Sequence, residues 1–183
     1  MFMYFLATNP EKQEIVYQEI ITVLGKDETT LTESMLNRLK YLKASLKESL
    51  RLFGSVMGLG RKTQVDMVLS EHFIPKGTYV TYSFYNNHMD DKQFPNPEQF
   101  LPERWLRDCP IHQKPHPFAY MPFAHGPRMC IGRRFAELEL LILAIKMLQR
   151  FRLEYHDEPI DYETGFTARP TKNVNLRLID RNI

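Results

Sequence analysis

The sequence predicts a mainly α-helical chain with a small β-sheet, an α+β fold, and three patterns support this prediction. Apolar residues recur at helical spacing over 10–24 and 33–53. Residues 61–85 are instead rich in β-branched and aromatic side chains, which favour strands. The segment 133–149 is apolar almost all round, which indicates a buried helix, and it is too short to span a bilayer. A chain of 183 residues, 43% of them hydrophobic, can bury a sizeable core and ordinarily forms one domain.

Charge and cysteine content narrow the classes of function. The formal net charge of +2, with 25% charged residues, gives no overall field that would favour nucleic acid as a partner. Cys109 and Cys130 make neither a disulfide framework nor a zinc pattern, which fits a reducing compartment. We therefore expect no nucleic-acid partner and expect any basic binding surface to be local.

The N-terminal stretch is expected to hold the tail of one helix and the whole of the next. Residues 1–8 are typical of the end of an apolar helix, and the following Asn-Pro dipeptide begins the helix over 10–24. Gly25 ends that helix as a C-cap. The opening residues are too few to cross a bilayer and carry no basic leader or cleavage site. Because the sequence begins within a helix, we expect it to be truncated on the N-terminal side relative to the natural fold.

The helix over 33–53 carries leucines at helical spacing, so one face of it is expected to lie in the core. Glu48 and Arg51 lie three residues apart on the same side of this helix and can form a charge pair. Most pairs of this kind are exposed to solvent and stabilise a protein little. The spacing alone therefore leaves two interpretations open, a surface pair or a buried one.

The next part of the chain is predicted to change from helix to strand and then to an irregular segment. Strands are expected over 65–69 and 79–84, joined through the turn Pro75-Lys76-Gly77. Residues 86–132 hold most of the twelve prolines and lack periodicity, so they form a long ordered loop rather than regular structure. The histidines and the aspartate pair of this loop (His88, His112, His116, Asp90 and Asp91) do not have the spacing of metal ligands.

Residues 123–132, Phe-Ala-His-Gly-Pro-Arg-Met-Cys-Ile-Gly, set Cys130 between Gly126 and Gly132. The two glycines allow a tight loop and a close approach to a flat ligand. The helix predicted over 133–149 begins directly after the loop, and its positive end favours a thiolate, which is a metal ligand. A buried structural cysteine in a glycine turn is the alternative. Two short strands within 150–179 complete the chain.

The pattern Phe123-x-x-Gly126-x-Arg128-x-Cys130-x-Gly132 resembles the haem-binding signature of the cytochrome P-450 monooxygenases. The resemblance implies the C-terminal part of the P-450 fold, haem b as cofactor and Cys130 as proximal iron ligand and catalytic centre. It also implies that Phe123 screens the sulfur and that Arg128 pairs with a haem propionate. Arg61 resembles the second propionate-pairing arginine by position only, and an ordinary surface arginine is the alternative.

The same family has a buried Glu-x-x-Arg pair joined by a later arginine, which Glu48, Arg51 and Arg104 resemble. This resemblance implies a structural triad that holds the cysteine loop in place, with no part in the chemistry. Breaking a buried triad is costly because it leaves a charge without its partner.

A basic face on the helix over 33–53 suggests an electron donor. Lys43 and Lys47 resemble the lysines with which animal mitochondrial members receive an adrenodoxin-type 2Fe–2S ferredoxin, and Arg133 and Arg134 also resemble that branch. A solvated basic face is the alternative on spacing alone. The resemblance implies a mitochondrial location on the matrix side of the inner membrane. The alternative is an endoplasmic reticulum member supplied by an NADPH flavoprotein reductase.

The implied activity is insertion of one atom of O2 into a lipophilic organic substrate, such as a steroid or xenobiotic, at a haem-thiolate centre. Residues 1–8 resemble the tail of the long helix that carries the family's oxygen-activating motif. That motif does not occur in the printed sequence. The second interpretation is therefore a truncated haem-binding fragment without activity.

Overall fold

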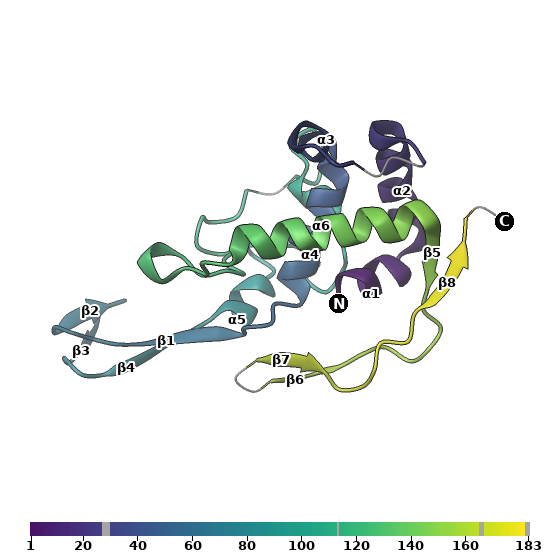
Figure 1. Ribbon diagram of the computed structural model, residues 1–183. Coiled ribbons are helices and arrows are strands. Elements are labelled where there is room, and N and C mark those ends of the chain that lie inside the picture. Colours follow the sequence, from purple (N-terminus) through teal and green to yellow (C-terminus); the bar gives the residue numbers. More distant parts are fainter. Residues whose placement is uncertain (27–29, 113, 165–166, 182–183) are drawn as a thin grey trace.

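The structure is a computed structural model that describes residues 1–26, 30–112, 114–164 and 167–181. A run of helices comes first along the chain, a run of strands follows, and the long helix α6 precedes the last strands (Figure 1). The α-helices are α1 (Phe2–Ala7), α2 (Pro10–Leu24), α3 (Glu33–Arg38), α4 (Lys40–Leu52), α5 (Phe84–His88) and α6 (Arg133–Arg150), with 3-10 turns η1 (Pro102–Trp105) and η2 (Gly126–Arg128). The strands are β1 (Gly58–Lys62), β2 (Met67–Leu69), β3 (His72–Ile74), β4 (Tyr79–Ser83), β5 (Phe151–Glu154), β6 (Tyr162–Thr164), β7 (Ala168–Pro170) and β8 (Arg177–Asp180).

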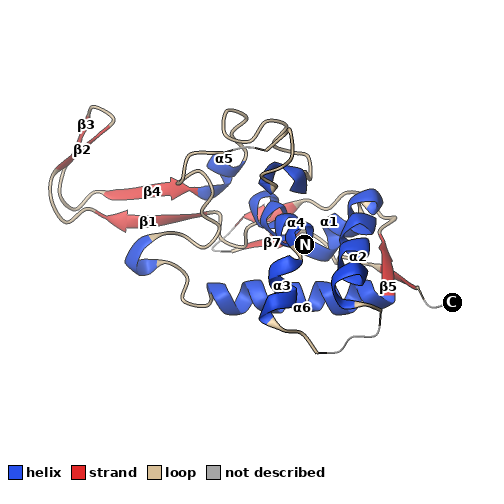
Figure 2. Cartoon of the chain, turned by 90° about the horizontal axis from the view of Figure 1, so that it is seen from above, coloured by secondary structure: helices blue, strands red, loops and turns tan. Residues whose placement is uncertain are grey.

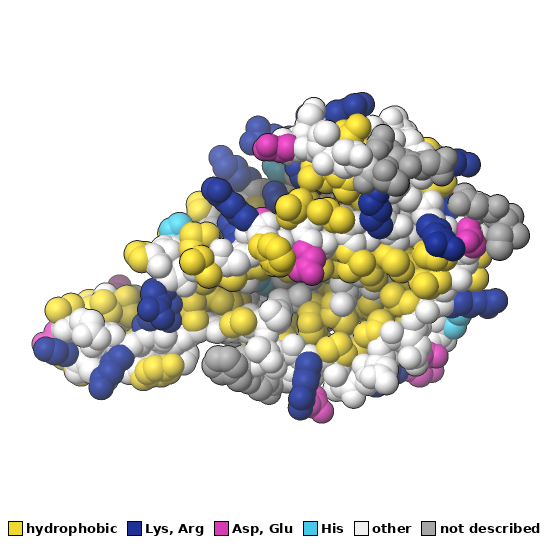
Figure 3. All heavy atoms as spheres, viewed as in Figure 1, with side chains coloured by type: hydrophobic (Ala, Val, Ile, Leu, Met, Phe, Trp, Pro, Cys, Tyr) yellow, Lys and Arg dark blue, Asp and Glu magenta, His cyan; other side chains and the backbone are white. Residues whose placement is uncertain are grey.

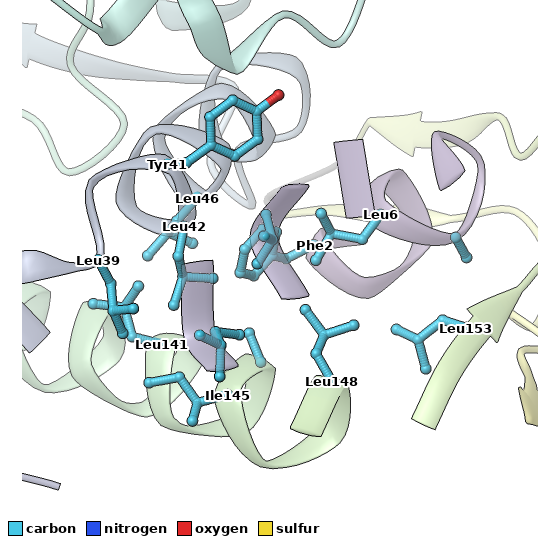
Figure 4. Packing of buried hydrophobic residues seen from close by; sticks show 14 of the residues in the cluster. Phe2, Leu6, Leu39, Tyr41, Leu42, Leu46, Leu141, Ile145, Leu148 and Leu153 are labelled. Atoms are coloured by element: carbon cyan, nitrogen blue, oxygen red, sulfur yellow. The ribbon is translucent and has the colours of Figure 1, made fainter. Parts of the chain in front are cut away.

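The hydrophobic core lies where α1, α2 and α4 pack over α6 and β5 (Figures 1 and 4). Leu6, Leu42, Ile145 and Leu148 are fully buried in it. Burying one such aliphatic side chain stabilises the fold by roughly 1.5–3 kcal/mol. The core thus fixes the direction of α4 and α6, the two helices that carry the predicted site residues.

Gln13 is a buried amide that joins three elements of this core. Its Nε2 donates to the carbonyl oxygens of Leu6 and Leu153, both at 2.9 Å, and its Oε1 accepts from Leu153 N at 2.8 Å. The side chain is only 1% exposed. Since a buried amide is tolerated when its hydrogen bonds are made, Gln13 can hold α1 and β5 against α2.

The helix expected over 33–53 is divided, because Leu39 leaves the helical conformation at φ −78° and ψ 74°. A carboxylate from α2 explains the restart. Glu19 Oε1 accepts from Tyr41 N at 2.8 Å and Glu19 Oε2 accepts from Leu42 N at 2.9 Å. These bonds satisfy backbone donors of the first turn of α4 that have no partner within the helix.

We expect Glu19→Ala to lower the free energy of unfolding by about 0.5–2 kcal/mol, the usual cost of losing a helix N-cap. Urea denaturation followed by circular dichroism measures the change. The matched control is Glu139→Ala, which removes an exposed carboxylate from the middle of α6. An equal loss in both variants would contradict a capping role for Glu19.

The predicted strands do not pair with each other. β2 pairs with β3 through a tight turn at Ser70 and Glu71, and β1 pairs with β4 in a ribbon that extends from the helical body (Figure 2). β1 has no strand signal in the sequence because two of its five residues are glycine. A Cβ atom at Gly58 would lie 2.5 Å from Tyr82 O, so the ribbon requires glycine there. The expected strand end at Phe84 is instead the start of α5, which Ser83 Oγ caps by accepting from Asn86 N at 3.2 Å.

The helix predicted to be buried over 133–149 is covered on one side only by the described residues. α2, α4 and β5 cover one side of α6, and its apolar residues on other sides are exposed, as in Phe135 at 73%. Figure 3 shows hydrophobic side chains over much of this surface. An apolar helix indicates faces that favour burial, but it does not indicate which faces the described residues cover. None of the described helices has the length and apolar character needed to cross a membrane.

The C-terminal region holds more strands than expected. β5 pairs with β8, whose first residue is Arg177. Between them, β6 pairs with β7 in a separate hairpin that the polar sequence did not indicate. The Ala168 N–H donates to Ser55 O at 2.8 Å, which fastens this hairpin to the segment after α4.

Candidate functional site

The loop before α6 presents the Cys130 thiol at the surface. The N–H of Cys130 donates to Phe123 O at 2.9 Å and closes the loop, and the N–H of Met129 donates to Gly126 O at 3.0 Å. Gly126 has φ +80°, a left-handed conformation that glycine adopts without strain. The loop therefore holds its backbone by internal hydrogen bonds and leaves the sulfur open.

Exposed apolar side chains follow the thiol along the chain. Ile131 is fully exposed next to it, and Phe135 is largely exposed one turn into α6. At Gly132, an added Cβ would lie 3.9 Å from Cys130 Sγ, so glycine keeps this side of the sulfur clear. Phe123 packs under the Arg133 guanidinium, with Cζ 5.7 Å from the ring centroid. A flat apolar ligand could approach the sulfur over this surface.

The two arginines predicted for haem propionates are both exposed. Neither Arg61 nor Arg128 forms an ion pair with any residue that the structure describes. Arg61 lies in β1, not ahead of the first strand, and its Nη1 donates to Gly60 O at 2.8 Å. A cavity of about 690 Å³ runs along the β1–β4 ribbon beside it.

The β1–β4 ribbon contacts the segment that leads into the cysteine loop. Tyr82 Oη of β4 donates to Phe118 O at 2.8 Å, and the Phe118 and His125 rings meet edge to face with centroids 5.2 Å apart. The donor set fits a haem group: a thiol for iron, apolar side chains for the porphyrin face and unpaired guanidiniums for carboxylates.

Glu48, Arg51 and Arg104 are brought together in the interior, at most 2% exposed. Glu48 Oε1 accepts from Arg51 Nη2 at 2.8 Å and from Arg104 Nε at 3.0 Å, and Glu48 Oε2 accepts from Arg51 Nε at 3.0 Å. Leu101 N and Trp105 Nε1 also donate to the carboxylate, at 3.1 and 2.9 Å. The pair is therefore buried, and its carboxylate has donors on both oxygens. Sequence reasoning missed the role of Trp105, which follows Arg104 directly.

Hydrogen bonds lead from this triad to the cysteine loop. Arg51 Nη1 donates to His88 O at 2.8 Å, His88 Nε2 accepts from Met121 N at 3.2 Å, and Met121 O accepts from Ala124 N at 3.0 Å. These bonds connect the triad through His88 to the segment that leads into the cysteine loop.

His88 is a buried histidine whose environment favours the neutral ring. Burial lowers its pKa to about 4 from 6.5, and the nearby charge of Arg51 acts in the same direction. The ring lies between Phe84 and Tyr120, with centroid distances of 6.5 and 5.5 Å. A neutral ring can accept the Met121 N–H, whereas a protonated ring cannot.

This environment predicts an acid-sensitive fold. Between pH 6.5 and about 4 the unfolded His88 binds the proton and the folded one does not, so stability falls as pH falls through this window. We expect this to remove up to about 3 kcal/mol of unfolding free energy. Urea denaturation at several pH values should show a weaker pH dependence for His88→Gln, which keeps an acceptor for Met121 N. The exposed His72→Gln should retain the full dependence.

The four residues predicted for partner docking lie on two helices. On α4, Lys43 Nζ donates to Asn37 Oδ1 at 2.8 Å, and Lys47 Nζ lies 5.8 Å from the Trp105 ring centroid. On α6, Arg133 Nε lies 3.1 Å from Glu137 Oε1, and Arg134 is exposed. No described contact joins the lysines to the arginines directly.

Tyr120 contacts the backbone of α4 at one of the docking lysines. Its Oη donates to Lys47 O at 3.1 Å. Burial raises the pKa of Tyr120, and the Glu137 and Glu48 carboxylates raise it further. The histidines of the long loop have other contacts: His112 Nδ1 lies 3.0 Å from Arg104 O, and His116 Nδ1 accepts from Phe118 N at 3.2 Å.

Comparison with known proteins identifies the family. The cytochrome P-450 family model matches residues 1–177. The chain is 37% identical to probable cytochrome P-450 49a1 of Drosophila melanogaster over 98% of this chain and 32% of that protein. It is also 37% identical to human mitochondrial 25-hydroxyvitamin D-1 alpha hydroxylase, over 98% of this chain and 35% of that protein. The chain thus spans about a third of the length of these relatives.

A solved structure supports the same conclusion. Retinoic-acid-bound cyanobacterial CYP120A1 superposes with a TM-score of 0.86 and 31% identity, covering 96% of this chain and 40% of that one. The predicted fold class, mainly α with small sheets as part of the P-450 fold, is confirmed by this match. This match and the family match over residues 1–177 together show that the chain belongs to the cytochrome P-450 family.

Proposed function

We propose that the chain is the C-terminal portion of a single cytochrome P-450 domain and supplies the thiolate side of a haem b monooxygenase site. The single observation that carries this is the open Cys130 thiol, held by a hydrogen-bonded glycine loop at the start of α6. The family match and the exposure of Arg61 and Arg128 agree with it.

Each predicted residue has a distinct task in this proposal. Cys130 binds the iron, Phe123 screens the sulfur, and Gly126 and Gly132 keep the loop tight and open. Arg128 and Arg61 hold the propionates, since guanidinium groups bind carboxylates in a fixed geometry. The Glu48, Arg51 and Arg104 triad keeps the loop in position. Haem, when bound, would activate O2 so that one of its two oxygen atoms is inserted into the substrate.

The substrate class that we propose is a lipophilic small molecule such as a steroid or xenobiotic. The name of the human relative refers to a vitamin D compound and the cyanobacterial structure contains retinoic acid, both lipophilic. An inactive haem-binding fragment is the alternative, because the chain spans only about a third of its relatives. Adding haem to residues 1–183 and recording the reduced CO-bound spectrum tests the haem site. A thiolate-type Soret band is expected, and a spectrum without it would overturn the proposal.

The electron donor that we propose is an adrenodoxin-type 2Fe–2S ferredoxin that approaches the face formed by Lys43, Lys47, Arg133 and Arg134. The names of several relatives place them in mitochondria, which is where we place this protein, on the matrix side of the inner membrane. A flavoprotein reductase at the endoplasmic reticulum is the alternative donor.

We expect Lys43→Gln/Lys47→Gln to weaken ferredoxin binding by about tenfold and to flatten its salt dependence, because surface charges steer an acidic partner. Isothermal titration at two salt concentrations measures both effects. Lys26→Gln/Lys172→Gln removes the same charge from exposed positions elsewhere and should bind as the wild type does. Equal affinity of the two double variants would count against this docking face.

A further inference from the structure

His88 is the last residue of α5, a short helix that other segments hold at both ends. At its start, the N–H groups of Phe84 and Tyr85 donate to Met57 O at 2.8 and 3.2 Å. At its end, Arg51 Nη1 donates to His88 O at 2.8 Å. The backbone of His88 therefore has a defined position, from which its ring reaches the next segment of the chain.

The ring of His88 supplies a hydrogen-bond acceptor to the segment ahead of the cysteine loop. His88 Nε2 accepts from Met121 N at 3.2 Å, and the ring packs on Tyr120 with centroids 5.5 Å apart. His88 is only 3% exposed, so its ring meets little water. Met121 N donates to no other acceptor within the described ranges of the chain, so this single bond anchors it.

Met121 begins a tight turn that contains a strained residue. Met121 O accepts from Ala124 N at 3.0 Å, and Ala124 has φ +60°, a left-handed conformation that is uncommon for a residue with a Cβ atom. Such a conformation persists only where the surrounding contacts impose it. Within the same turn, Phe123 O accepts from Cys130 N at 2.9 Å. The turn over 121–124 and the backbone of Cys130 thus form one hydrogen-bonded unit.

We infer that His88 is a positioning residue for Cys130. Its ring anchors the turn over 121–124 in the strained conformation, and the Phe123 carbonyl of that turn sets the position of the cysteine backbone. The inference rests on the proposed role of Cys130 as iron ligand. It adds to that role a residue from another segment, which acts on the thiol through the turn.

This anchor is sensitive to protonation. Arg51 of α4 is the charged group that faces His88 among the described residues, and Tyr120 on the other side stays neutral because burial raises its pKa. Burial lowers the pKa of His88 to about 4 from 6.5, and the Arg51 charge acts in the same direction. A ring released from its contacts regains its ordinary pKa, so protons favour the released state between pH 6.5 and about 4. Since one proton binds, release should increase by up to about tenfold per pH unit in this window.

Amide hydrogen exchange of residues 1–183, followed by NMR near neutral pH, tests the anchor without haem. His88→Phe keeps an aromatic ring between Phe84 and Tyr120 but offers no acceptor. We expect this variant to lower the protection of the Met121 and Cys130 amides about tenfold. Leu148, in the hydrophobic core, should keep its protection. The matched variant His88→Gln retains an acceptor and should keep most of the protection.

A second substitution relieves the strain in the turn. Glycine adopts the φ of +60° found at Ala124 without strain, so Ala124→Gly should restore part of the protection that His88→Phe removes. After haem is added, the reduced CO-bound thiolate band should follow the same order. It should be weak in His88→Phe and stronger in His88→Phe/Ala124→Gly.

The outcomes separate this inference from the proposed haem site. Unchanged protection of the Met121 and Cys130 amides in His88→Phe would overturn the inference. An equal loss at Leu148 would also overturn it, because that loss would show lower stability of the whole fold rather than release of the turn. A wild-type chain without a thiolate band would contradict the haem site, whereas the exchange data would still decide the role of His88.

If His88→Phe does not fold, exchange at pH 6.5 and at about pH 5 decides. A larger loss of Cys130 protection in the wild type than in His88→Gln supports the anchor, and an equal loss overturns it.

Discussion

Replacing Cys130 with serine is expected to abolish the thiolate-type spectrum of the haem-loaded chain. A serine hydroxyl stays protonated near neutral pH and is a much poorer ligand for iron than a cysteine thiolate. The loop itself should survive, since its closing hydrogen bond uses the backbone N–H of residue 130 and the carbonyl of Phe123. The expected effect is therefore a complete loss of one spectral signature in a folded protein.

The matched control for this experiment is Cys109→Ser, which removes the second thiol of the chain. Cys109 follows η1, where its N–H donates to Leu106 O at 3.1 Å. Reduced CO-bound spectra of both variants should show the thiolate band in Cys109→Ser alone. Retention of the band in Cys130→Ser would remove Cys130 as the iron ligand.

Replacing Glu48 with glutamine is expected to destabilise the fold by about 3–5 kcal/mol, because it leaves two buried guanidinium groups without their counter-charge. Glutamine has the size of glutamate, but its NH2 group would face N–H donors of Arg51 or Trp105. In the wild type these donors bind a carboxylate oxygen. Urea denaturation followed by circular dichroism measures the loss. Glu33→Gln, at an exposed position in the first turn of α3, should change stability by less than about 0.5 kcal/mol.

A second variant separates charge pairing from packing in the triad. Glu48→Leu/Arg51→Leu/Arg104→Met removes all three charges together, and replacing a whole buried ion network by apolar residues is often close to neutral. Here Arg51 also donates to His88 O and Gln99 O, so those carbonyls lose their donors in the triple variant. We expect it to be more stable than Glu48→Gln, whereas a larger loss would show that packing matters more than pairing.

The sequence predicted the fold class because helical and strand periodicities are local signals. The three-residue spacing of Glu48 and Arg51 could show that they pair, but not that the pair is buried. Trp105 completes that site from 57 residues away. Such contacts depend on the path of the intervening chain, which periodicity does not describe.

The incorrect predictions of helix and strand bounds also arise from contacts between segments that are distant in the sequence. The break at Leu39 depends on Glu19, a residue of another helix. β1 was missed because the close approach of Tyr82 requires glycine at position 58, where glycine disfavours a strand on propensity alone. The exposed side of α6 could not be predicted, because an apolar pattern shows which side chains favour burial but not which other segments cover them. Each error reflects a tertiary contact that overrides or goes beyond a local preference.

The Gln13 amide has a consequence for folding during synthesis. It joins α1 to β5 through Leu153, which follows 140 residues later in the chain. At a translation rate of about 5–20 residues per second, about 7–28 s pass before Leu153 is made. Throughout that interval the Gln13 amide lacks its main partner, because Leu153 has not been made. Contacts of such long separation also slow folding once the chain is released. The first helices therefore reach their final packing only after nearly the whole chain has been synthesised.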